Sequence, residues 1–403
     1  YPFNMTLGAI KDLKLVEKVG TSMAKESKRM GVHFNFAPVL DININPKNPI
    51  IGYRSFGENK VSVTEHAIAL MNGAQAQGIF STGKHFPGHG DTATDSHSTL
   101  PVVNASLEHI EKIELYPYKR MFDEGLVSVM VAHLSVPSLE PRINYPTSIS
   151  YNVVTNILQN QLGFEGLVFT DALNMKGASN YKKEDGVALT PGDIDLEAFL
   201  AGNDILLFSE NVPAAIEKIC FAYQNGIISE HRLSRSVKKI LKFKYFAGLN
   251  NYKSITTDNL ISDIYPSSND ALQYQLYENA ITVVKNKSSI LPIKSFSIKA
   301  LAISFAATWS SANLSILFCS AYVPAAAKKP AWRIPPPKTL RIRLAFLIKF
   351  WLLNNKLPTG VPKPLLKQIE ILSNISPYCF GVSPLAIIAL KSLAPSKCNF
   401  KLC

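Results

Sequence analysis

Short apolar runs recur along the first 250 residues at spacings typical of buried β-strands. These runs are Phe34–Leu40, Ile79–Lys84, Val127–Ala132, Gly166–Thr170 and Asp204–Phe208. Each has the length of a strand and few polar side chains, as expected for strands that are covered on both faces of a sheet. The pattern therefore predicts five strands of a buried sheet.

Between these runs, apolar residues recur with the ~3.6-residue period of an amphipathic helix. The helical stretches are Leu15–Met30, Val63–Ala76, Leu107–Phe122, Tyr151–Leu162, Val212–Tyr223 and Leu233–Phe246. Ser150 and Asn211 precede two of them and are predicted N-caps, and a glycine follows each stretch where the helix should end. Strands and helices therefore alternate along the chain.

This alternation predicts a parallel sheet, either in an open doubly wound fold or in a (β/α)8 barrel. Polar residues distinguish the two, because Asp41, Lys84–His85, His133 and Asp171 lie at or just past the ends of four different strands. A barrel collects side chains from several strands at one rim, whereas an open sheet concentrates its site at one switch point. The sequence therefore favours an α/β fold with a (β/α)8 TIM-like barrel. Because the first element is a helix and five strands are visible, the barrel is expected to be incomplete at the N-terminus.

The domain boundaries follow from the same pattern. Residues 1–250 are assigned to the barrel, and residues 251–267 are polar and are predicted to be a linker. Residues 268–305 are expected to begin a second domain, an α/β sandwich. Its predicted elements are a helix at Ala271–Ala280 and strands at Ile281–Lys285 and Ile298–Ser304.

Charge separates the last part of the chain from the rest. The formal net charge is +12, yet residues 1–305 balance 29 Lys and Arg against 29 Asp and Glu. Residues 306–403, the basic tail, contain 13 basic residues and a single acidic one, Glu370. The net charge therefore gives no evidence of a polyanionic partner for the main body. Cys220 is the only cysteine before the tail, so the main body forms no internal disulfide.

The composition of the basic tail is compatible to different degrees with three explanations. A nucleic-acid module would interleave aromatic and basic residues, and here the basic residues are scattered among Leu, Ile and Ala. A membrane-surface segment could lie around Arg341–Leu353, but Arg341, Arg343 and Lys349 interrupt that stretch, which is too short to span a bilayer. The abrupt change in composition favours a third explanation, that residues 306–403 are not read in their native frame.

The loop after the second strand carries a high density of titratable residues, in the sequence KHFPGHGDTATDSHSTLP from residue 84. A solvated surface loop rarely collects so many. A metal site on His85 and His89 would require a helix to bring both to one face, and Pro87 and its neighbouring glycines exclude a helix. Acid–base chemistry is favoured, because Asp95 and His97 face the same way in an extended segment. A carboxylate so placed can fix the imidazole tautomer for proton transfer.

Two further strand ends carry candidate residues. Asp171 ends a buried strand and is either a turn-capping residue or a carboxylate nucleophile. Asp41 ends the first strand and is followed by Arg54, a pair that suits a ligand rich in hydroxyl and carbonyl groups. Taken alone, Asp41 reads more simply as a turn cap and Arg54 as part of a structural ion pair.

Taken together, these motifs resemble those of glycoside hydrolase family 3, in its β-N-acetylglucosaminidase (β-N-acetylhexosaminidase) subgroup. The loop from Lys84 to Pro101 resembles the family signature, and Thr170-Asp171-Ala172-Leu173-Asn174-Met175 resembles its nucleophile motif. Phe36–Asp41 and Arg54–Gly57 fit two other segments of the family. The resemblance covers roughly residues 1–305 and stops abruptly at the basic tail.

The resemblance implies retaining hydrolysis of terminal β-linked N-acetylglucosamine, with muropeptides from cell-wall turnover as the expected substrates. Asp171 would be the nucleophile, and His97, partnered by Asp95, would be the general acid and base. The sugar would be bound by Asp41, Arg54, Lys84 and His85. No metal or organic cofactor is implied, and no nucleic-acid partner.

The family resemblance is compatible with cytoplasmic, periplasmic and membrane-anchored forms, and a targeting segment would lie upstream of Tyr1. Two other functions stay open at this stage. A neutral histidine base would not repel an anion, so phosphate could replace water and make the protein a β-N-acetylglucosaminide phosphorylase. The other alternative is a non-catalytic sugar-binding remnant that keeps the fold without the activity.

Overall fold

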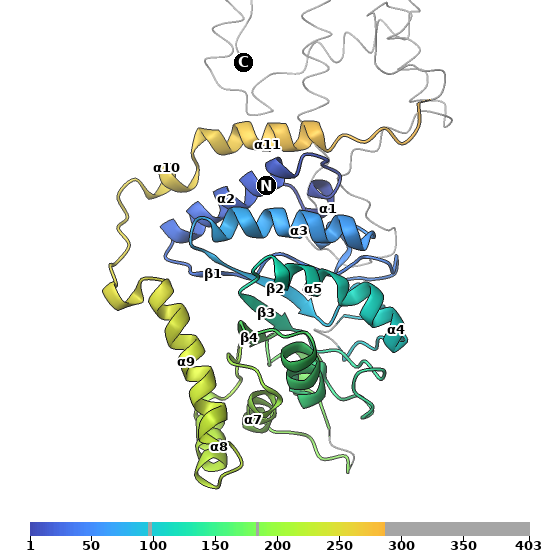
Figure 1. Cartoon of the computed structure of the whole chain (residues 1–403), viewed down its shortest axis with the longest axis vertical. Helices are drawn as coiled ribbons and strands as arrows, with labels where there is room; N and C mark the ends of the chain where they lie inside the picture. The colour runs from blue at the N-terminus through green and yellow to red at the C-terminus, as the bar shows by residue number, and fades with distance from the viewer. Residues whose placement is uncertain (96–98, 183–184, 287–403) are drawn as a thin grey trace, which may run out of the picture. The chain divides into compact units, whose positions relative to one another are not determined.

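Four parallel strands form the sheet (Figure 1). In the computed structural model, which describes residues 1–95, 99–182 and 185–286, they are β1 (Phe34–Asn35), β2 (Phe80–Phe86), β3 (Ser128–Val131) and β4 (Leu167–Thr170). The strands lie in the order β1-β2-β3-β4, and each pair is parallel. A parallel bridge between Phe169 and Ile205 adds the fifth predicted run beside β4.

The order of the strands bears on the choice between the two parallel folds. In a doubly wound sheet the strand order reverses at a switch point. Here each of the five segments pairs with the next one along the chain, as successive strands of a barrel do. The prediction of an α/β fold with a parallel sheet is confirmed, and closure into eight strands stays a prediction.

The first strand is shorter than the apolar run that predicts it. Regular pairing of β1 ends at Asn35, and Val39 returns to the sheet through a bridge to Lys84. Pro38 lies between them and has no N–H to donate to a neighbouring strand, so the ladder is interrupted there. Beyond the interruption the Leu40 amide donates to the Lys84 carbonyl at 2.6 Å, which brings Asp41 next to the end of β2.

Helices and shorter helical turns connect the strands and extend beyond them. The α-helices are α1 (Asn4–Leu7), α2 (Leu13–Arg29), α3 (Lys60–Gln75), α4 (Leu107–His109), α5 (Tyr116–Asp123), α6 (Lys176–Ser179), α7 (Pro191–Ala201), α8 (Val212–Gln224), α9 (Glu230–Phe246), α10 (Leu260–Ile264) and α11 (Ser267–Asn279). Two π-helical segments are η2 (Ile110–Glu114) and η4 (Asn152–Gln161), and the short 3₁₀ turns are η1 (Gly52–Arg54), η3 (Thr147–Ile149) and η5 (Leu249–Asn251). None of the helices in these described ranges is both long and apolar enough to cross a membrane.

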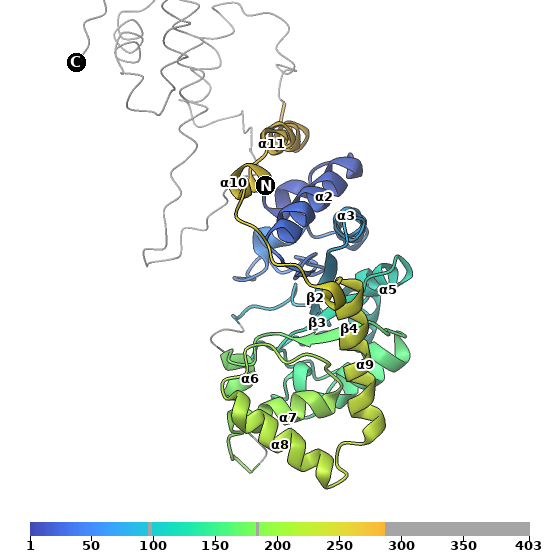
Figure 2. The ribbon, with the colours of Figure 1, turned by 90° about the vertical axis from the view of Figure 1, so that its left-hand side faces the viewer.

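Most of the predicted helices are present, and both predicted N-caps accept hydrogen bonds. The Asn211 side chain accepts from the Ala214 amide at 3.1 Å, and the Ser150 hydroxyl accepts from the Val153 amide at 3.2 Å. The stretch 107–122 is divided into α4, η2 and α5 instead of forming one helix. Helix α7, which the sequence pattern missed, begins with a capping box between Thr190 and Asp193 and packs against α8 (Figure 2).

The segment after residue 250 differs in part from expectation. The predicted linker, 251–267, contains the short helix α10, and the predicted helix at 271–280 is confirmed as α11. The predicted strand Ile281–Lys285 is wrong, because these residues form no strand. A strand needs a partner for its backbone hydrogen bonds, and none of the described residues pairs with this segment. The strand predicted at Ile298–Ser304 and the basic tail lie outside the described residues.

Helix α11 packs on α2, near the other end of the sequence (Figures 1 and 2). Leu272 and Leu276 are buried and join the main hydrophobic core. Arg29 at the end of α2 donates to the Asp263 carboxylate at 2.7 Å and to two backbone carbonyls of residues 256 and 258. Asn269 donates to Glu26 at 2.7 Å, so α10 and α11 are fixed to α2 by polar as well as apolar contacts.

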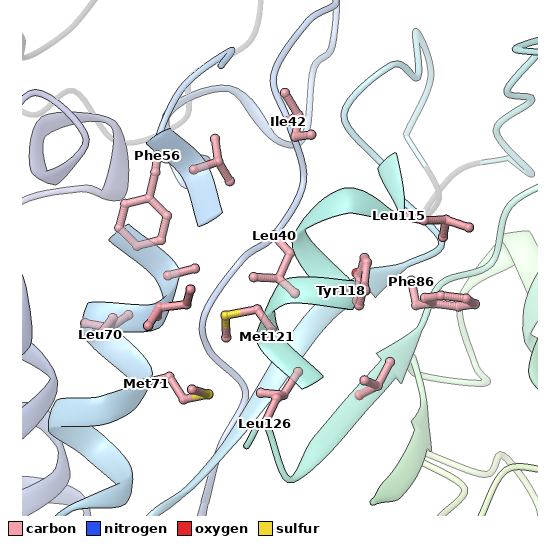
Figure 3. Close-up of a cluster of buried hydrophobic side chains, with 14 of the residues drawn as sticks. Leu40, Ile42, Phe56, Leu70, Met71, Phe86, Leu115, Tyr118, Met121 and Leu126 are labelled. Atoms are coloured by element: carbon pink, nitrogen blue, oxygen red, sulfur yellow. The ribbon is translucent and has the colours of Figure 1, made fainter. Parts of the chain in front are cut away.

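The main core lies between α3, α5 and the first strands (Figure 3). Phe86 and Tyr118 are fully buried, and their rings meet edge to face with centroids 5.0 Å apart. Gly83 in β2 leaves room for the side chains of Leu40 and Leu126 in the same core. A Cβ on Gly83 would lie 2.8 Å from atoms of both. The core therefore supports β2 directly below the loop that carries the titratable residues.

Helices α2 and α3 approach each other closely through two glycines. A Cβ on Gly20 would lie 2.1 Å from the Leu70 carbonyl oxygen, and one on Gly73 would lie 2.0 Å from the Glu17 carbonyl oxygen. Neither position has room for a side chain without a shift of one helix. Glycine is therefore required at both positions by packing, although it lowers intrinsic helix stability.

Substitution Gly20→Ala is expected to lower the free energy of unfolding by about 1–3 kcal/mol, because overpacking outweighs the gain of about 1 kcal/mol in helix propensity. Urea unfolding followed by circular dichroism measures the change. Lys25→Ala, at an exposed position of the same helix, is the control and should change the value by less than about 0.5 kcal/mol. A Gly20→Ala protein as stable as the control would contradict the packing argument.

Candidate active site

The carboxyl ends of the strands bring the predicted site residues together. Lys84 and His85 lie near the end of β2, Asp171 follows β4, and Asp41 follows the segment that bridges to Lys84. Arg54 ends the turn η1 and lies against His85. The structure thus places all five of these residues in one cluster at the same edge of the sheet.

The centre of this cluster is the Asp41 carboxylate, whose side chain is fully buried. One oxygen contacts Nδ1 of His85 at 2.6 Å. The other accepts from the backbone amides of His85 at 3.2 Å and of His89 at 2.7 Å. Asp41 thereby fixes two points of the loop after β2, and its own oxygens are buried.

These contacts decide the charge on Asp41. Burial acts to raise the pKa of its carboxyl, but electrostatic attraction to His85 and His89 and the hydrogen bonds from both outweigh burial. The pKa of Asp41 therefore lies below its usual value, and the group is ionised at neutral pH. Burial, reinforced by the nearby His85, lowers the pKa of His89.

His85 is held on both sides of its ring. Arg54 Nη2 lies 3.4 Å from Nε2, and because a guanidinium can only donate, Nε2 is the acceptor in this contact. Nδ1 then carries the proton that it donates to Asp41. The Arg54–His85–Asp41 chain therefore fixes the orientation and tautomer of His85.

A second set of hydrogen bonds, made by Asn48, also holds the loop after β2. The buried Asn48 side chain donates to the carbonyls of His89 at 2.8 Å and Gly90 at 3.1 Å, and it accepts from the Ile50 and Ile51 amides. Gly90 is needed here, since a Cβ would lie 1.8 Å from the Ile42 carbonyl oxygen. Sequence reasoning missed Asn48, because its partners are about 40 residues away and no local motif marks it.

Asp171 is partly exposed and faces the cluster from β4. Its amide donates to the Val131 carbonyl at 2.8 Å, which continues the β3–β4 pairing, and one carboxylate oxygen accepts from the Ala172 amide at 2.8 Å. Burial acts to raise the pKa of Asp171, but His85, His133, the Ala172 amide and Lys84 together lower it below its usual value. Asp171 is therefore ionised at neutral pH, and among the described residues the hydrogen bond found for its carboxylate goes to one oxygen.

Lys84 adjoins this carboxylate, and Arg54 in turn lies near Lys84. Lys84 interacts electrostatically with Arg54, Asp171 and Asp41. Burial lowers the pKa of Lys84, the Arg54 charge lowers it further, and the two aspartates oppose the decrease. The site therefore combines a partly exposed carboxylate with donors that suit hydroxyl and carbonyl oxygens.

His133, the remaining strand-end residue, is fully buried and supports the site from behind. Its Nδ1 lies 2.6 Å from the Ser148 hydroxyl, and its Nε2 lies 2.9 Å from the Ala172 carbonyl oxygen. Because a carbonyl can only accept, Nε2 carries a proton. His133 thus ties the residue after Asp171 to the turn η3.

The predicted acid–base pair is only partly described. Asp95 is within the described residues, and its carbonyl accepts from the Thr99 amide at 3.0 Å. His97 lies outside the described residues. In the parts of the chain that the structure covers, no group of three or more His, Cys, Asp or Glu residues is arranged to hold a metal ion.

Comparison with known proteins shows which family the chain is similar to. The family model for the glycosyl hydrolase family 3 N terminal domain matches residues 1–243. Beta-hexosaminidase A of Pseudoalteromonas piscicida is 31% identical over 317 residues, which cover 72% of this chain and 50% of that protein. The chain thus spans about half the length of the curated relatives it matches.

Solved structures agree with the sequence comparison. A glycoside hydrolase family 3 beta-N-acetylglucosaminidase from Paenibacillus sp. str. FPU-7 superimposes with a TM-score of 0.61 at 34% identity, over 71% of this chain and 53% of that one. Beta-glucoside phosphorylase BglX superimposes with a TM-score of 0.65 at 25% identity, over 72% of this chain and 53% of that one.

Substitution Asp41→Ala is expected to lower the free energy of unfolding at pH 7 by about 3–5 kcal/mol, because three donors lose a buried, charged acceptor. Since the pKa of Asp41 is lower in the folded state, its contribution is present above the unfolded pKa and disappears as pH falls through the folded pKa. Urea unfolding at neutral and strongly acidic pH should therefore show a deficit that shrinks in acid. Asp123→Ala, at an exposed position, is the control. An equal deficit at both pH values would argue against an ionised Asp41 in the folded state.

Proposed function

The chain belongs to glycosyl hydrolase family 3, and on this basis we propose that its protein is a retaining glycoside hydrolase that removes terminal β-linked N-acetylglucosamine residues. The observation that carries the proposal is the partly exposed, ionised Asp171 beside Lys84 and His85 at the carboxyl end of β4. The names of the relatives from Pseudoalteromonas piscicida and Paenibacillus support the hexosaminide as substrate.

In the proposed reaction Asp171 is the nucleophile. Its carboxylate oxygen attacks the anomeric carbon, the bond to the leaving oxygen breaks, and a covalent glycosyl-enzyme forms. Its lowered pKa supports this role, because only the ionised form can attack. The Ala172 amide holds one oxygen of the carboxylate and leaves the other available to the sugar.

The proton donor in this proposal is His97, with Asp95 as its partner. His97 would protonate the leaving oxygen in the first step and remove a proton from water in the second. An imidazole suits both steps near neutral pH because its ordinary pKa is about 6.5. The support for His97 is its position in the family-like loop, thirteen residues after the Lys84 that adjoins Asp171.

The sugar is proposed to lie between the two loops that follow β1 and β2. Lys84 and Arg54 would donate to its hydroxyl and N-acetyl oxygens, and Nε2 of His85 would accept from a hydroxyl, with Asp41 holding His85 through Nδ1. The expected natural substrates are muropeptides that end in N-acetylglucosamine. Measured turnover of such fragments would establish that part of the proposal.

Phosphorolysis is the second candidate reaction. The structural likeness to beta-glucoside phosphorylase BglX supports it as an alternative to hydrolysis. A phosphate oxygen would attack the anomeric carbon of the glycosyl-enzyme, and the bond to Asp171 would break. The products would be a sugar 1-phosphate and the free carboxylate. Lys84 and Arg54 supply positive charge on the same side of the site as Asp171, which would favour an anionic acceptor.

Hydrolysis of a chromogenic β-N-acetylglucosaminide by the full-length protein tests the main proposal. Asp171→Asn and His97→Ala should each lower kcat by at least ~10²-fold, because each removes a group that forms or protonates a bond in the transition state. Asp123→Asn, an exposed carboxylate on α5, is the matched control and should retain full activity. Full activity of Asp171→Asn would overturn the nucleophile assignment. Sugar binding without turnover by the wild type would indicate a binding remnant instead.

The choice between water and phosphate is tested by product analysis. If phosphate is the acceptor, saturating phosphate should convert most of the product to N-acetylglucosamine 1-phosphate, detected by mass spectrometry. If the protein is a hydrolase, free N-acetylglucosamine should form at the same rate with and without phosphate. Absence of the sugar phosphate under saturating phosphate would eliminate phosphorolysis.

A further inference from the structure

Glu114 is a buried carboxyl group directly beneath the loop after β2. It ends the π-helical segment η2 and is 1% exposed. Both of its oxygens are buried, and neither has a hydrogen-bond partner among the described residues. An unpaired carboxyl in such a place is unusual, because a buried polar group without a partner costs about 1–3 kcal/mol.

The Glu114 side chain lies against the backbone of Gly88. A Cβ on Gly88 would lie 2.4 Å from Oε2 of Glu114 and 2.8 Å from its Cβ. Gly88 lies between His85 and His89, both of which are bound to Asp41. The carboxyl therefore fills the space under the loop that presents His85.

Within residues 1–95 and 99–182, the charged groups found to act on Glu114 are both acidic. Asp41 interacts with it from the segment after β1, and Asp91 from the far end of the loop. Tyr118 on α5 interacts with it as well, and the buried Tyr118 hydroxyl has no hydrogen-bond partner in the part of the chain that the structure describes. Burial, followed by the charges of Asp41 and Asp91, raises the pKa of Glu114 to about 8.

We propose that Glu114 is a positioning residue of the sugar site: in its uncharged form the carboxyl seats the Gly88 segment and so holds the Asp41–His85 pair in its binding geometry. This inference rests on the proposed function, because the sugar is the ligand that His85 would contact. Glu114 itself does not reach the site, so its role is support and not catalysis.

Ionisation of Glu114 would undo this support. A negative charge would then lie beside two aspartates with no donor to stabilise it, so water must enter or the Gly88 segment must move away. The binding-competent form is the protonated one, which is present below the pKa and lost above it. Sugar binding should therefore weaken as pH rises through about 8. Folding stability should also fall with rising pH, between the unfolded pKa near 4.5 and the folded value of about 8.

The test is isothermal titration calorimetry of N-acetylglucosamine binding to the full-length protein at pH 7 and pH 9. For the wild type, the fraction of protonated Glu114 falls about tenfold over this interval, so the apparent Kd should rise about tenfold. Glu114→Gln has the same shape and no charge at any pH. Its Kd should match the wild type at pH 7 within about threefold and should not rise at pH 9.

Two more variants serve as a control at an exposed position and as a test of the filling role of the side chain. Glu108→Gln makes the same chemical change at an exposed position of α4 and should keep the tenfold rise of the wild type. Glu114→Ala removes the filling group, so it should bind the sugar weakly at pH 7 with no further loss at pH 9. This second substitution keeps the proposal testable if the glutamine protein does not fold.

The outcomes separate this proposal from the proposed function. A tenfold rise that persists in Glu114→Gln would overturn the positioning role and would point to another group, such as Lys84. No sugar binding by the wild type at pH 7 would overturn it too. A rise abolished by Glu114→Gln while Asp171→Asn keeps full turnover would support the positioning role and overturn the nucleophile assignment. Conversely, a tenfold rise that persists in Glu114→Gln, together with loss of turnover in Asp171→Asn, would overturn the positioning role and support the nucleophile assignment.

Discussion

The buried Asp41 carboxylate is the interaction on which the rest of the site depends. It accepts hydrogen bonds from three nitrogen atoms that belong to His85 and His89, and it lies at the end of a strand that Pro38 interrupts. A charge buried this deeply is tolerated only when it is fully paired. The conformation of the loop after β2 is therefore coupled to the ionisation of one group that never reaches the surface.

Three carboxyl groups at or near the site differ in their protonation state and in their exposure to solvent. Asp41 is ionised and satisfied, Glu114 below it is neutral, and Asp171 above it is ionised and partly exposed. Their partners set these states: Asp41 has three donors, Glu114 has none among the described residues, and Asp171 has one amide and nearby positive charge. A nucleophile and its support can thus be built from the same functional group.

The sequence predicted where β2, β3 and β4 lie and which polar residues follow them, because short apolar runs and the polar residues that end them are local signals. It failed where the cause is not local. Asn48 holds a loop about 40 residues away, and no motif marks it. Glu114 lies in an amphipathic stretch where a carboxylate suggests the solvent face, yet the π-helical segment turns it inward. Helix α7 was missed although Thr190 and Asp193 form a capping box, because its apolar residues lack a clear helical period.

The packing of α11 on α2 has a consequence for synthesis of the chain. Asn269 and Glu26, which join the two helices, are 243 residues apart. At ribosomal rates of about 5–20 residues per second, α2 waits roughly 10–50 s for its partner. Throughout that interval the surface that later receives Leu272 and Leu276 is uncovered on the nascent chain. Among the described elements, α2 is therefore covered late, and during that interval it is open to chaperones and to aggregation.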